Sequence, residues 1–127
     1  MRTRLGFVVG LVLLIGLVGS ARAGSRSTRQ VMVASGMAQG SLGSARNSSD
    51  GIQYIGCQVY GTSTVTAYCF AEDSSYHYVS CSTTTPAMVQ IAQSLNSDSV
   101  LYFSVNSSGA CTYLIAQTSS DSAPKNP

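Results

Sequence analysis

Residues 52–82 read IQYIGCQVYGTSTVTAYCFAEDSSYHYVSCS, three consecutive segments rich in β-branched and aromatic residues. The three segments are residues 52–60, 64–72 and 76–82. The short gaps between them, GTS and DSS, have the composition of turns. This pattern predicts a three-strand antiparallel meander.

The equal spacing of the first three cysteines sets their register in this meander. Hairpins centred on residues 63 and 75 would place Cys57 opposite Cys69, and Cys69 opposite Cys81. Adjacent strands lie about 4.8 Å apart, so Cys57 and Cys81 would be about 10 Å apart, beyond the ~7 Å Cα limit of a disulfide. Pairing 57–81 with 69–111 is therefore disfavoured. Two pairings stay open: 57–69 with 81–111, and 69–81 with 57–111.

Strand alternation assigns the side chains of the meander to two faces. One face collects small and aliphatic residues and the cysteines: Ile55, Cys57, Val59, Val65, Ala67, Cys69, Ala71, Val79 and Cys81. The other face collects Thr64 and Thr66 and six aromatic residues: Tyr54, Tyr60, Tyr68, Phe70, Tyr76 and Tyr78. These six form the candidate binding surface, because tyrosine offers both stacking area and a hydroxyl to a glycan, a peptide or a protein. Alternatively, the rings pair across strands and residues 31–47 cover them.

A helix and two further strands follow the meander. Thr85 and Pro86 suit the N-cap and N1 positions of a helix. Met88, Ile91, Ala92 and Leu95 then fall on one apolar stripe. Strands are expected at residues 99–105 and 110–117, joined by a turn at NSSG. The predicted fold class is α+β: a mainly antiparallel sheet in the order β-β-β-α-β-β, with one short helix on one face and two disulfides.

The N-terminus has the three parts of a cleaved secretory signal peptide, which we expect at residues 1–23. Arg2 and Arg4 precede an apolar run, and small Ala21 and Ala23 occupy the −3 and −1 positions. The apolar run is shorter than the ~20 residues of a membrane span. A flexible N-terminus is expected at residues 24–30 and a disordered tail at residues 119–127. Between them we expect a Gly/Ser-rich segment at 31–50, which forms one extended stretch or an ordered loop, and the disulfide-stabilised α+β domain at 51–118.

An even number of cysteines in a short exported chain predicts disulfide bonds and a secreted or periplasmic location. The four cysteines are separated by 11, 11 and 29 residues, unlike the close ligand pairs of zinc sites. The five acidic residues match no calcium loop. We therefore expect neither a metal nor another cofactor.

The charge balance argues against nucleic-acid binding. The whole chain has a net charge of +2, but three of its seven basic residues lie within residues 1–23. Four basic residues then remain against five acidic ones, which gives −1. No basic patch is left to neutralise a series of phosphates.

His77 is the only histidine, and a hydrolase would have to pair it with an acid such as Asp73, Glu72 or Asp50 and with a serine. The chain has no nucleophile-elbow motif, and in a serine-rich chain some Ser–His proximity arises by chance. A partly exposed side chain near a strand end is the simpler interpretation of His77.

Residues 40–115 resemble a group of small exported bacterial proteins that have no established activity. The segments that carry the resemblance are Gln53-Tyr54-Ile55-Gly56-Cys57, Cys69-Phe70-Ala71-Glu72-Asp73, Cys81-Ser82, Asp98-Ser99 and Gly109-Ala110-Cys111, with a short helix between the last two cysteines. The resemblance implies one compact domain and a bacterial source, and it implies no catalytic or binding residues.

From the sequence we expect a non-enzymatic exported protein that binds an unknown protein or glycan, or that forms part of an extracellular or envelope structure. Self-association through the edge of strand 99–105 or strand 110–117 would accompany the structural role. An inhibitor or effector that docks on a larger protein is one alternative, and a small hydrolase that uses His77 is the other.

Overall fold

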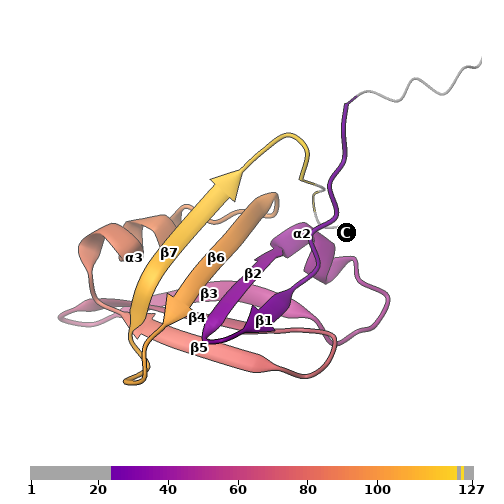
Figure 1. Cartoon of the computed structure of the whole chain (residues 1–127). Coiled ribbons are helices and arrows are strands. Elements are labelled where there is room, and N and C mark those ends of the chain that lie inside the picture. The colour runs from indigo at the N-terminus through magenta and orange to yellow at the C-terminus, as the bar shows by residue number, and fades with distance from the viewer. Residues whose placement is uncertain (1–23, 123, 125–127) are drawn as a thin grey trace, which may run out of the picture.

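The computed structural model of the protein describes residues 24–122 and residue 124, and its strands form two layers (Figure 1). The first layer is a three-stranded sheet in chain order: β3 (Tyr54–Gly61), β4 (Val65–Glu72) and β5 (Tyr78–Thr83). The second is a four-stranded sheet in the order β1-β2-β6-β7, with bounds Met32–Ala34, Met37–Ser41, Ser99–Val105 and Cys111–Thr118. The two helices are α2 (Leu42–Arg46) and α3 (Pro86–Gln93).

The α+β class, the antiparallel pairing and the order β-β-β-α-β-β after residue 51 are confirmed. The predicted strands divide between two sheets, because β6 pairs with β2 and not with the meander. Residues 31–50 hold a hairpin and helix α2 in place of one extended segment or loop. The hairpin turns at Ser35 and Gly36, both with positive φ, as a two-residue type I′ turn requires.

The register within the meander is the one that the cysteine spacing predicts. Cys57 lies opposite Cys69, and Cys69 lies opposite Cys81. Disulfides join Cys57 to Cys69 and Cys81 to Cys111, so the pairing 69–81 with 57–111 is wrong. The first bridge links neighbouring strands of one sheet. The second links β5 to β7 and so fastens the two sheets together.

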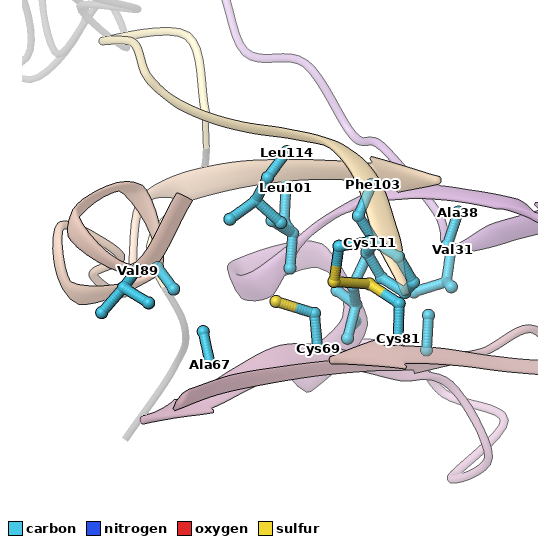
Figure 2. Close-up of a cluster of buried hydrophobic side chains, with 14 residues drawn as sticks. Val31, Ala38, Ala67, Cys69, Cys81, Val89, Leu101, Phe103, Cys111 and Leu114 are labelled. Atoms are coloured by element: carbon cyan, nitrogen blue, oxygen red, sulfur yellow. A yellow bond between two sulfur atoms is a disulfide. The ribbon is translucent and has the colours of Figure 1, made fainter. Parts of the chain in front are cut away.

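The hydrophobic core fills the space between the layers (Figure 2). The four-stranded sheet contributes large side chains, among them Leu101, Phe103 and Leu114. The three-stranded sheet contributes small ones, such as Ala67 and Cys69. The predicted inner face of the meander is therefore confirmed, except at Val65, which is 47% exposed beside the β3–β4 turn.

Helix α3 packs beside this core against β3, β4 and β7. Pro86 occupies the first turn as predicted, but the Thr85 side chain makes no cap hydrogen bond. Val89 and Ala92 are the buried residues of the helix, and Met88, Ile91 and Leu95 pack partly buried against the core. The sequence pattern therefore predicted the correct helix but missed Val89. The buried face of the helix is centred on Val89 and Ala92, which leaves Met88 and Ile91 at its margin.

The two ends of the described chain lie beside each other. The Ser27 N–H donates to the Asp121 carbonyl at 2.8 Å, and the Arg29 guanidinium lies 3.7 Å from the Asp121 carboxylate. The Arg29 N–H also donates to Ser44 Oγ. Within the described residues, stretches that the sequence predicted as loose therefore contact the domain. The predicted signal peptide at 1–23 and tail residues 123 and 125–127 lie outside the described residues.

One predicted route of self-association is wrong. Strand β6, which corresponds to residues 99–105, pairs with β2 on one side and β7 on the other, so it has no free edge. Strand β7 is at the edge of its sheet, as the prediction for residues 110–117 requires.

Candidate functional site

The outer face of the three-stranded sheet carries the aromatic residues that the sequence singled out. We call it the tyrosine face and define it by five residues of β3, β4 and β5: Tyr54, Tyr60, Tyr68, Phe70 and Tyr78. Their side chains point outward because the alternate positions, including all three cysteines of the meander, point into the core.

Four of these rings form one connected group. The Phe70 ring lies between Tyr54 and Tyr68, with centroid distances of 6.0 Å and 5.8 Å. The Tyr68 and Tyr78 hydroxyls are 2.8 Å apart. Gly56 lies opposite Phe70, and a Cβ atom at Gly56 would come within 3.9 Å of the Phe70 ring. A Cβ atom at Gly56 would therefore make only an ordinary contact with this ring.

The tyrosine face is open to solvent. Tyr54, Tyr60 and Tyr78 are 40%, 52% and 51% exposed. In the alternative interpretation of the sequence, residues 31–47 cover these rings. The structure shows that this segment forms β1, β2 and α2, and that its Val31 and Ala38 join the core on the opposite side of the meander. The interpretation that this segment covers the rings is wrong.

The structure separates two of the six predicted residues from the connected group. Tyr60 lies at the far end of β3, opposite Thr66. Tyr76 lies in the turn before β5 with φ 64° and is 70% exposed, so it does not belong to a strand face. The sequence placed it on a strand because its neighbours continue the aromatic alternation, whereas the hydrogen bonds of Asp73 make this stretch a turn.

Hydroxyl and amide groups surround the rings, and of these the sequence pattern had identified only Thr66. Strand alternation places four such residues on the same face: Gln58, Thr66, Ser80 and Ser82. Glu72 lies between Tyr54 and Tyr78 and is the only charged residue of the three strands. The same alternation, applied to every position of the strands, would have found Gln58, Glu72, Ser80 and Ser82 as well.

Hydrogen bonds on the face polarise the phenols. The bond to Glu72 is the largest cause that raises the pKa of Tyr54 above its ordinary value. Bonds from Ser80 and then Tyr78 lower the pKa of Tyr68, whereas the bond to Tyr68 raises that of Tyr78. Either hydroxyl of the Tyr68–Tyr78 pair can donate to the other, so the pair can offer a ligand both a donor and an acceptor.

His77 and Asp73 form a pair that stabilises the β4–β5 turn. Asp73 Oδ1 accepts from the Ser75 and His77 N–H groups at 2.9 Å and 3.0 Å, and Oδ2 lies 3.0 Å from His77 Nδ1. Burial opposes ionisation of Asp73, but the hydrogen bonds from His77 and Ser75 outweigh it, so the pKa of Asp73 lies below its usual value. The His77 side chain is 67% exposed. This geometry is that of a turn residue.

Among the described residues, no group of three or more His, Cys, Asp and Glu side chains is arranged to hold a metal ion. Over the same residues, no helix has the length and apolar character needed to cross a membrane. Comparisons with protein-family models, with curated protein sequences and with solved structures found no match.

Proposed function

We propose that the protein is an exported, non-enzymatic binding protein and that the tyrosine face is its binding surface. The observation that supports this most is that four contacting aromatic side chains occupy an open sheet face. Two disulfides are typical of an oxidising compartment, in agreement with the signal-peptide pattern at residues 1–23.

The chemistry of the face favours a neutral polysaccharide as the ligand. A sugar ring presents an apolar C–H face that can pack on an aromatic ring, and hydroxyl groups that can bond with phenol, amide and hydroxyl side chains. The tyrosine face offers these partners side by side, with Tyr68 and Phe70 at its centre. Glu72, which bonds with Tyr54, gives the three strands one negative charge and no positive charge, so the face would repel an anionic ligand.

The other two functions have less support. A docking inhibitor needs a projecting loop, and the turns at residues 62–64, 73–77 and 106–110 are short. A hydrolase needs a nucleophile bonded to His77 Nε2, and among the described residues the ring of His77 bonds only through Nδ1, to Asp73.

Retention on insoluble cellulose, chitin and starch tests the proposal. We expect the oxidised protein to bind at least one of the three, and Tyr68→Ala and Phe70→Ala each to weaken binding about tenfold, ~1.4 kcal/mol. Tyr76→Ala is the matched control, because Tyr76 is 70% exposed in a turn that lies outside the tyrosine face and outside the four-stranded sheet. Thermal unfolding of every variant would show that the fold is kept.

The proposal fails if folded protein is retained on none of the three polysaccharides. It also fails if Tyr76→Ala weakens retention as much as Tyr68→Ala, because the ligand would then not lie on the tyrosine face.

A further inference from the structure

The four-stranded sheet has a second exposed face, on the side opposite the core. Two cross-strand rows run across β1, β2, β6 and β7: Ala34, Met37, Ser104 and Tyr113 form one row, and Met32, Gln39, Tyr102 and Ile115 form the other. Met32, Met37 and Tyr113 are 58%, 57% and 53% exposed. We call these two rows the apolar face. A contiguous apolar area of this kind is uncommon on a protein that acts alone.

A groove runs over this face. Its volume is about 230 Å³, and its lining includes Met32, Ala34, Met37, Gln39, Tyr102 and Tyr113. Pockets that enclose small molecules usually measure about 300–1,000 Å³ and bury most of the ligand. This groove is smaller, and its rim residues stay more than half exposed. Its size suits side chains that protrude from another protein surface.

The charge pattern selects among the possible partners. The four strands β1, β2, β6 and β7 contain no charged residue. Arg29 lies at the Tyr102 end, where its Nη1 donates to Tyr102 Oη at 2.8 Å and its Nη2 lies 3.7 Å from Asp121. One cation already paired with an acid gives little attraction to an anionic membrane, which requires several bases. A charged protein partner would likewise find no complement here.

We propose that the apolar face is the interface of a homodimer, in which the same face of a second copy covers it. Two uncharged faces meet without like-charge repulsion, and a two-fold axis would bring the exposed Met32, Met37 and Tyr113 of each copy against the same face of the other. Exposed methionines adapt their shape to such a contact. The inference is independent of the proposed ligand, because it concerns the opposite sheet.

Sedimentation velocity over a concentration series of the oxidised protein tests this proposal. We expect the sedimentation coefficient to rise from monomer to dimer with concentration. Met37→Lys and Tyr113→Lys should each raise the dissociation constant at least about tenfold, since each would place like charges in the interface. Tyr78→Lys on the tyrosine face is the matched control, because Tyr78 is also about half exposed, at 51%.

A wild-type protein that stays monomeric at every concentration would overturn the proposal. So would a dimer that Tyr78→Lys disrupts while Met37→Lys and Tyr113→Lys leave it intact. Thermal unfolding of the three variants separates loss of the dimer from loss of the fold.

Discussion

The two sheets contribute different residues to the core and different residues to the surface. The four-stranded sheet supplies the large core side chains, with Leu101 and Phe103 at most 1% exposed. The three-stranded sheet faces them with Ala67, Cys69 and Ala71, all at 0%. Its aromatic residues lie on the outer side. The bulky side chains of one sheet therefore build the fold, whereas those of the other remain available for binding.

The disulfides occur where the side chains are small. The three cysteines of the meander lie in one cross-strand row on its inner face. In this row, Cys57 is bridged to Cys69. The third, Cys81, is bridged to Cys111 of the other sheet. Covalent bonds thus support the layer whose buried side chains are small.

The same substitution made in both sheets should give the largest difference. Phe103→Ala removes a ring that is 1% exposed and should cost about 3–5 kcal/mol of unfolding free energy. Phe70→Ala removes a half-buried ring from the tyrosine face and should cost about 1 kcal/mol. Urea denaturation under oxidising conditions measures both. Equal losses would show that the tyrosine face is part of the structural core.

Removal of each disulfide compares a bond within one sheet with a bond between the two. The bridges span sequence separations of 30 and 12 residues. Loop closure in the unfolded chain then predicts losses of ~4 kcal/mol for Cys81→Ala with Cys111→Ala, and ~3 kcal/mol for Cys57→Ala with Cys69→Ala. The same denaturation experiment on the two double variants checks this order. A larger loss for Cys57→Ala with Cys69→Ala would mean that the bond between the sheets stabilises the fold less than the bond within one sheet.

Acid should destabilise the loop between α2 and β3 through Asp50, whose hydrogen-bond partners are Ser48, Ile52 and Gln53. Hydrogen bonds from the Gln53 N–H and then the Ile52 N–H lower the pKa of Asp50 from 3.8 to about 2. Because the folded-state pKa is depressed, this contribution to stability is complete above about pH 4 and is lost as the pH falls through about 2. In Asp50→Asn, the melting temperature should therefore fall less over that range. A slope equal to that of the wild type would contradict this role.

The smallest effect is expected in the β1–β2 hairpin. Ser35 adopts φ 51° before Gly36 at φ 74°, and asparagine is favoured over serine at the first position of such a turn. Ser35→Asn should stabilise the protein by about 0.5 kcal/mol. Thermal unfolding measures the gain, and Gly36→Ala is the opposite control, since it would bring a Cβ atom to 3.2 Å from the Val105 carbonyl oxygen.

Much of the three-stranded sheet could be predicted because its sequence is regular. The 11-residue intervals between Cys57, Cys69 and Cys81 set the register, and strand alternation then placed the tyrosines on the outer face. The choice between two disulfide pairings was out of reach. It depends on where β7 lies relative to β5, and no local pattern fixes that long-range contact.

The four-stranded sheet was harder to predict, and with it the apolar face. Strand β1 has only three residues, and its turn uses Ser-Gly in place of the usual Asn-Gly. Gly40, one of the glycines that suggested a loop, lies in β2, where a Cβ atom would approach Val31 to 3.1 Å. Alternation in strands 99–105 and 110–117 could not show that β2 would become their neighbour.

Amide chemical-shift mapping by NMR would test most directly that the tyrosine face is the binding surface. A soluble oligosaccharide of the polysaccharide that retains the protein would be titrated into the oxidised protein. The account predicts that the largest shifts fall on β3, β4 and β5, around Tyr68 and Phe70, with β1, β2, β6 and β7 unchanged. Shifts concentrated on the four-stranded sheet, around Met37 and Tyr113, would contradict it.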